Sequence, residues 1–252
     1  MSLYKAEGVV LRTRNLGEAD RIVTLYTREQ GKVECVARGS RRVRSRLTGP
    51  TQLFTHGRFL LFSGRSLETL SQAEIVSSFA ALRDDLTKMA YASYLAELLD
   101  VSVEPGEPSE DLFDLCLGSF RALEAQVPPE VVSRHFELRL MALLGYAPHI
   151  AACVGCGRPP GEYGEQGAFS TREGGFLCPR CLHRDGAAIA VRRSTLEWIR
   201  RLAESPADRL HVLRIGGEDL RLLEAVARAW VDYRIERPLK SLGFLAALKD
   251  LA

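Results

Sequence analysis

The spacing of the apolar residues changes near Ser78, and this change limits the folds that the chain can adopt. Residues 1–75 contain five short apolar runs separated by turn-forming residues, namely KAEGVVLRTRN, DRIVTLYT, KVECVA, LFTHGRFLLF and LETLSQAEI. Five β-rich segments with one long polar loop between the third and the fourth favour a small closed barrel of the OB type. A small β-sandwich also fits this pattern.

Beyond Ser78 the apolar residues recur at helical spacing. A first helical stretch carries leucines at 82, 86, 95 and 99 and runs up to Glu104. We expect further helices to begin after Ser109, at Pro128-Pro129, after a cap at Ser194 and near Glu218, with a last short one in SLGFLAALKDL. The sequence therefore predicts an all-α body behind the barrel.

Two Cys-x-x-Cys pairs, separated by 21 residues, give the strongest chemical signal: Cys153, Cys156, Cys178 and Cys181. Each pair can place two thiolates on one ion, and four thiolates form a closed tetrahedral shell that suits structural Zn²⁺. The glycine-rich segment between the pairs carries Phe169 and Phe176 on either side of a Gly-Gly turn, as a zinc-ribbon hairpin requires. We therefore predict one structural zinc ion.

Other interpretations of the cysteines are weaker. A redox function needs only one pair and a thioredoxin-like βαβ context, and the spacing matches no familiar ferredoxin pattern. His183 is interpreted as a surface histidine, and the isolated Cys35 and Cys116 as small buried apolar residues.

These patterns together predict an α+β multidomain chain. Its parts are an N-terminal OB-type β-barrel in residues 1–78 and an all-α helical domain in residues 79–252. A zinc-ribbon-like segment that carries the four paired cysteines is inserted into the helical domain at about 147–190.

The near-neutral net charge of +2 hides an uneven distribution. Residues 1–80 contain thirteen Lys or Arg and seven Asp or Glu, so this part is basic and the remainder is mildly acidic. A basic first domain is typical of proteins that contact a polyanion. The alternative is that a positive charge of this modest size serves only to keep a small domain soluble.

The basic residues concentrate in one loop and on the outer faces of two predicted strands. Five of the nine residues 38–46 are arginine. Side chains alternate along strands, so residues 12 and 14 should share one face, as should residues 32 and 38. A solvated turn is the other interpretation of the loop. The predicted DNA-contacting residues are Arg12, Arg14, Lys32, Arg38, Arg41, Arg42, Arg44 and Arg46.

Motifs for phosphate-binding loops, dinucleotide folds, zinc proteases and serine hydrolases are missing from the sequence, and its paired acids lie at predicted helix starts. We therefore expect a protein that is not an enzyme. The first residues lack a secretory profile and no window approaches eighteen apolar residues, which predicts a cytoplasmic protein without a membrane association.

Three stretches carry a resemblance to a known family. The run GVVLRTRNLGEADRIVTLYTREQGKVECVARGSRRVRSRL resembles the N-terminal signature of the RecO family of bacterial recombination mediators. The cysteine segment and RPLKSLGFLAAL at residues 237–248 are similar to later parts of the same family. In order and length, the resemblance covers essentially the whole chain.

The resemblance implies an OB domain, a helical domain and a zinc-binding segment. It also implies a nucleoid-associated protein that binds single- and double-stranded DNA and anneals complementary strands. With RecR as a partner, such a protein helps load RecA onto DNA coated by single-stranded DNA-binding protein (SSB), in the RecF pathway. For zinc it points to the four cysteines, and for DNA to the basic N-terminal stretch.

Three other functions agree with the same residues. A zinc-ribbon and OB adaptor for RNA or the transcription machinery would carry the same barrel, ribbon and basic loop. A metal-dependent nuclease with its acids dispersed in the sequence is the enzymatic alternative. A protein-only scaffold, in which the basic loop is incidental, is a third.

Overall fold

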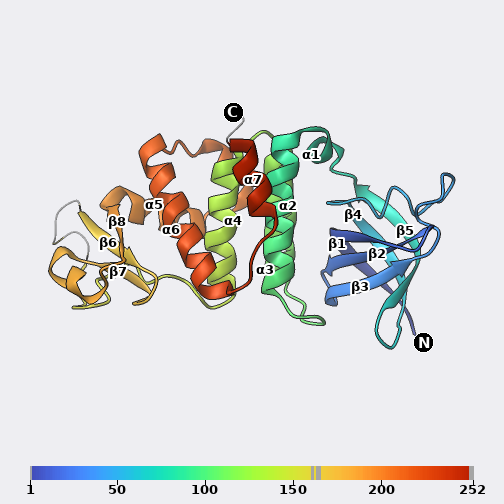
Figure 1. Ribbon diagram of the computed structural model, residues 1–252, viewed down its shortest axis with the longest axis horizontal. Helices are drawn as coiled ribbons and strands as arrows, with labels where there is room; N and C mark the ends of the chain where they lie inside the picture. Colours follow the sequence, from blue (N-terminus) through green and yellow to red (C-terminus); the bar gives the residue numbers. More distant parts are fainter. Residues whose placement is uncertain (1, 160–161, 163–165, 250–252) are drawn as a thin grey trace. The chain divides into compact units, whose positions relative to one another are not determined.

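The computed structural model describes residues 2–159, 162 and 166–249 (Figure 1). The chain forms two compact units, one of residues 1–129 with 238–252 and the other of residues 130–237. The domain division at residue 78 stays a prediction. Within the described ranges, no helix combines the length and the apolar composition that a membrane crossing requires.

The first unit begins with a closed barrel of five strands. These are β1 (Leu3–Leu16), β2 (Asp20–Thr27), β3 (Gly31–Ala37), β4 (His56–Phe62) and β5 (Glu68–Ser77), in the order β1-β2-β3-β5-β4. All neighbouring pairs are antiparallel except β3 and β5, whose short parallel pairing closes the barrel. This arrangement confirms the OB-type barrel and excludes the sandwich.

Alternation along the strands decides which residues fill the barrel. In β3 the side chains of Val33, Cys35 and Ala37 are buried, and Lys32 and Glu34 lie on the other face. Burial raises the pKa of the Cys35 thiol to about 12, so this cysteine is an unionised core residue, as predicted. The closed core contains, among others, Val10, Val23, Leu25, Phe59, Leu61 and Leu70.

Helices of the same unit follow the barrel: α1 (Ala80–Asp84), α2 (Leu86–Ser102), α3 (Glu110–Glu124) and α7 (Ser241–Lys249). The first predicted helical stretch is interrupted at Asp85, whose side chain accepts a hydrogen bond from Lys88 N and so caps α2. Ser109 caps α3 as predicted, since its Oγ accepts from Leu112 N at 3.3 Å. Helices α3 and α7 both contact α2 (Figure 1).

Arg28, in the turn between β2 and β3, links the barrel to α3. Its guanidinium lies over the Phe113 ring, 4.6 Å from the centroid, and donates to Asp114 at 2.7 Å and to Glu110. Buried Cys116 lies further along α3, and burial raises the pKa of its thiol to about 12. It is therefore a packing residue, as the sequence predicted.

In its described residues, the second unit contains three longer helices and a small sheet. The helices are α4 (Pro129–Leu143), α5 (Arg193–Glu204) and α6 (Gly217–Ile235), with 3₁₀ turns η2 (Pro179–Arg184) and η3 (Ala207–Val212). Strands β6 (Gln166–Ser170) and β7 (Gly175–Leu177) form the predicted hairpin, with Phe169 opposite Phe176. A third strand, β8 (Ile189–Arg192), pairs with β6 and was not predicted.

The predicted helix cap at Ser194 is wrong. Helix α5 begins at Arg193, so Ser194 lies inside its first turn. The hydroxyls of Ser194 and Thr195 instead donate to Asp219 of α6, at 2.9 and 3.0 Å. The Ser194 side chain, which the sequence pattern predicted to cap α5, therefore makes a tertiary hydrogen bond instead.

Glu97 of α2 caps the N-terminus of α7, which is more than 140 residues away in the sequence. Its carboxylate accepts hydrogen bonds from Lys240 N at 3.0 Å, from Ser241 N at 2.8 Å and from Ser241 Oγ. Burial raises the pKa of Glu97, but these hydrogen bonds from Ser241 and Lys240 outweigh burial and leave it lowered. The ionised carboxylate therefore holds α7 against α2.

We expect Glu97→Gln to destabilise the docking of α7 by about 1 kcal/mol, the usual cost of losing a helix cap. Because the pKa of Glu97 is lowered by folding, its contribution is present above about pH 4.3 and is lost as the pH falls through the lowered value. Urea unfolding and amide exchange of residues 241–249 measure the effect. Glu124→Gln at an exposed position is the control, and an equal loss in both variants would contradict the capping role.

Candidate nucleic-acid face and metal centre

The four cysteines predicted as metal ligands converge in the second unit. Their Sγ atoms all lie within 4.8 Å of one another, and those of Cys156 and Cys178 are 3.8 Å apart. A regular tetrahedron with metal–sulfur bonds of 2.3 Å places neighbouring sulfurs about 3.8 Å apart. Four cysteines so close together could hold a metal ion, and among the described residues they form the one such cluster.

Two tight turns bring the sulfurs together. In the first, Gly157 N donates to Cys153 O at 2.8 Å, and Gly157 has a φ of +77°, which favours glycine. In the second, Cys181 N donates to Cys178 O at 2.8 Å at the start of η2. The Cys178 amide also donates to Cys153 Sγ at 3.3 Å, which ties one turn to the other.

The electrostatics of the four thiols favour a bound cation. Burial raises the pKa of Cys153, yet the amides of Cys178, Gly155 and Cys156 outweigh burial and lower it. For Cys181, loss of contact with water and the three neighbouring sulfurs raise the pKa to about 12. Without an ion the sulfurs therefore cannot all ionise, and a divalent cation would remove that conflict.

His183 lies outside this cluster, as the sequence predicted. Its side chain is exposed and its Nδ1 lies 3.0 Å from the carbonyl oxygen of Arg180. The set of four sulfurs therefore needs no histidine.

The basic loop, residues 38–55, is built from hydrogen-bonded turns. Gly39 N donates to Asp20 Oδ1 at 2.7 Å, and Arg41 N donates to Ala19 O at 2.9 Å, so the start of the loop is tied to the turn after β1. Ser40 and Thr51 are fully buried, and Leu47 packs against the barrel core. The loop is therefore an ordered part of the barrel.

Its five arginines point outward. All five side chains are exposed, and none forms an ion pair with a carboxylate in the part of the chain that the structure describes: Arg38, Arg41, Arg42, Arg44 and Arg46. One of them, Arg41, also donates to the carbonyl oxygen of Gly17 at 3.0 Å. The loop thus presents a group of uncompensated cations to solvent.

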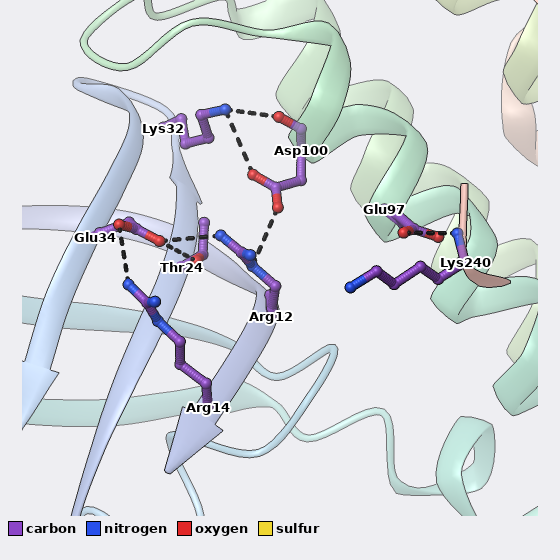
Figure 2. Close-up of polar contacts among 8 residues, drawn as sticks. All are labelled: Arg12, Arg14, Thr24, Lys32, Glu34, Glu97, Asp100 and Lys240. Carbon is purple, nitrogen blue, oxygen red and sulfur yellow. Dashed lines mark hydrogen bonds and ion pairs between the residues drawn. The ribbon is translucent and has the colours of Figure 1, made fainter. Parts of the chain in front are cut away.

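The three basic residues predicted on strands lie among carboxylates (Figure 2). Arg12 contacts Glu34 at 3.0 Å and Asp100 of α2 at 3.2 Å, and Arg14 lies 3.7 Å from Glu34. Lys32 is nearly buried; it donates to the Asp100 carbonyl oxygen at 2.6 Å and lies 3.4 Å from the Asp100 carboxylate. The eight predicted residues therefore divide into a free loop group and a paired strand group.

The sequence interpretation missed the acidic partners of the strand group. The sequence does indicate Glu34 as a partner, because it lies two residues after Lys32 and therefore on the same outer face of β3. Asp100 has no such indication, because nothing in the sequence of α2 shows that it meets the barrel. Of the aromatic residues that could stack on bases, Tyr26, Phe54 and Phe59 are buried in the fold.

Two family models match this chain. The family model described as recombination protein O, N terminal, matches residues 1–79, and the model described as recombination protein O, C terminal, matches residues 83–243. The chain belongs to the RecO family. The two matched ranges include both the basic loop and the four cysteines.

Relatives in the RecO family align over nearly the full chain. The DNA repair protein RecO of Symbiobacterium thermophilum is 44% identical over 251 residues, which cover 99% of both chains. That of Pelotomaculum thermopropionicum is 40% identical over 245 residues, covering 97% of this chain and 94% of its own. The resemblance found in the sequence is confirmed.

Gly155 lies inside the first cysteine turn of this RecO chain, where a side chain has no room. A Cβ at this position would lie 2.9 Å from both Cβ and Sγ of Cys181. We expect Gly155→Ala to weaken metal binding by roughly tenfold or more, as displaced ligand geometry does. Competition with a chromophoric chelator measures this.

The matched control is Gly186→Ala, also in the cysteine segment, where a Cβ meets nothing within 4 Å. Equal metal affinity in the two variants would show that the close approach at Gly155 is unimportant.

Proposed function

We propose that this chain is a non-enzymatic mediator of DNA repair and recombination. It binds single- and double-stranded DNA and anneals complementary strands. Its relatives carry the name DNA repair protein RecO, which supports a role in DNA repair. The observation that carries the DNA contact is the group of five exposed arginines without carboxylate partners, among the described residues, on an ordered loop of the barrel.

The mechanism involves no bond making or breaking. Guanidinium groups bind phosphates in two-pronged geometry and release the counterions condensed on DNA. Neutralising phosphates on two strands lowers the repulsion between them, so complementary bases can pair. The loop suits this task because its backbone is fixed by hydrogen bonds at residues 39 and 41 while its arginine side chains reach solvent.

Membership of the RecO family supports a proposal about the partners. We propose that the chain acts with RecR to load RecA onto single-stranded DNA coated by SSB, in the cytoplasm and associated with the nucleoid. The experiment is annealing of complementary oligonucleotides, one coated with SSB, across a salt series without nucleotide. Salt-sensitive annealing without strand cleavage supports the proposal, and no DNA binding at low salt overturns it.

Reversing the charge of three loop arginines together, Arg41→Glu, Arg42→Glu and Arg44→Glu, should weaken single-stranded DNA binding at least tenfold. If about four phosphates are contacted, the wild-type slope of log K against log salt is about −3, and the variant slope should fall to about −1. Fluorescence anisotropy with a labelled oligonucleotide measures both quantities.

A control triple with the same change in net charge uses exposed barrel residues outside the loop, namely Lys5→Glu, Arg58→Glu and Arg65→Glu. If both triples lose the same affinity, the loop has no special role and net charge alone governs binding.

We further propose that Zn²⁺ is the ion held by the four cysteines and that it has a structural role. Four sulfurs give a closed shell that suits zinc and leaves no position for a reacting water. The arrangement of the sulfurs supports this, because the distance of 3.8 Å between Cys156 Sγ and Cys178 Sγ is the one expected for two ligands of a tetrahedral zinc ion. The ion would fix a segment whose sheet, among the described residues, has three short strands.

Replacing Cys153 and Cys178 with Ser should remove the metal and destabilise residues 150–185, since structural zinc contributes roughly 10–16 kcal/mol of apparent binding free energy in finger peptides. Elemental analysis of the purified protein and limited proteolysis of this segment test it. His183→Ala is the control and should keep a full complement of zinc. Retained zinc in the double Ser variant would contradict the assignment of ligands.

A further inference from the structure

Glu34 contacts both arginines of the strand group. The strand registers place Arg12 opposite Thr24 and Thr24 opposite Glu34, so these three residues form one row across β1, β2 and β3. One carboxylate oxygen of Glu34 accepts from Arg12 at 3.0 Å and from the Thr24 hydroxyl at 3.1 Å, and the other lies 3.7 Å from Arg14. Figure 2 shows the carboxylate in contact with both arginines.

Both arginines remain accessible from solvent. The side chains of Arg12 and Arg14 are 53% and 56% exposed, whereas that of Glu34 is 32% exposed. An exposed ion pair of this kind contributes little to stability, typically less than about 1 kcal/mol. Glu34 therefore contributes little to the stability of the fold. Its negative charge, however, repels an anion that approaches Arg12 or Arg14.

Asp100 has a different position on the same face. Its carboxylate also contacts Arg12 at 3.2 Å, but its side chain and that of Lys32 are each only 13% exposed, and these contacts join α2 to the barrel. Asp100 is thus a packing residue, whereas Glu34 is the acid that solvent and a ligand can reach.

We propose that Glu34 is an affinity-determining residue that competes with DNA phosphates for Arg12 and Arg14. This inference rests on the proposed DNA binding of the barrel. A phosphate that contacts either arginine must displace the Glu34 carboxylate or approach it as a like charge. Arg12 and Arg14 therefore add little to DNA affinity beside Glu34, and the loop arginines dominate.

The test is Glu34→Gln, which keeps an oxygen that can accept from Thr24 but removes the charge. Single-stranded DNA binding near 0.1 M salt should become about three- to tenfold tighter. The slope of log K against log salt should steepen by about 0.7 for each arginine that gains a phosphate. Thermal unfolding of the variant checks that the barrel is intact.

Two further variants separate the local effect from net charge. Glu74→Gln makes the same charge change at a 72% exposed side chain on β5, 4.0 Å from Arg58, and should leave affinity nearly unchanged. Adding Arg12→Ala and Arg14→Ala to Glu34→Gln should abolish the gain.

The outcomes distinguish the two proposals. If the wild-type chain does not bind DNA at low salt, the proposed function fails. If wild type binds and Glu34→Gln gains no more than Glu74→Gln, the proposed function stands and the competitor role of Glu34 is overturned.

Discussion

The short parallel pairing of β3 with β5 is the contact on which the rest of the first unit depends. It joins Cys35 to Glu68 and Val36 to Thr69, and it closes a sheet that would otherwise expose two edges. Closure gives every strand one inner and one outer face. The inner faces form the apolar core, and the outer faces must then carry the charged residues of the same strands.

The position of each basic residue in the barrel decides whether it has an acidic partner. On the strands, the fixed register brings Arg12 beside Glu34, and packing of α2 brings Asp100 to Arg12 and Lys32. The loop after β3 leaves that register, so its arginines meet no acid within the described residues. The local density of basic residues in the sequence therefore indicated unpaired cations correctly in the loop. On the strands it did not, because ion pairs with acids cancel part of the positive charge there.

The cysteine segment is held together in a different way from the barrel. Its sheet pairs only a few residues on each strand, too few to bury a core of its own, although Phe169 packs edge-on against Trp230 of α6. Loss of contact with water and the three neighbouring sulfurs raise the pKa of the Cys181 thiol to about 12. A metal ion held by the four sulfurs would cross-link the two turns.

The sequence by itself determined the features that short-range signals specify. Alternation predicted all five barrel strands, Ser109 and Pro129 marked two helix starts, and the paired cysteines marked their own cluster. Strand β8 was missed because its four residues run directly into α5. Only the tertiary structure decided which acid meets which cation, since Arg12 and Glu34 are 22 residues apart and Lys32 and Asp100 are 68 apart. Register and helix packing select these partners, and both depend on the whole fold, because a single turn or strand does not specify its neighbours.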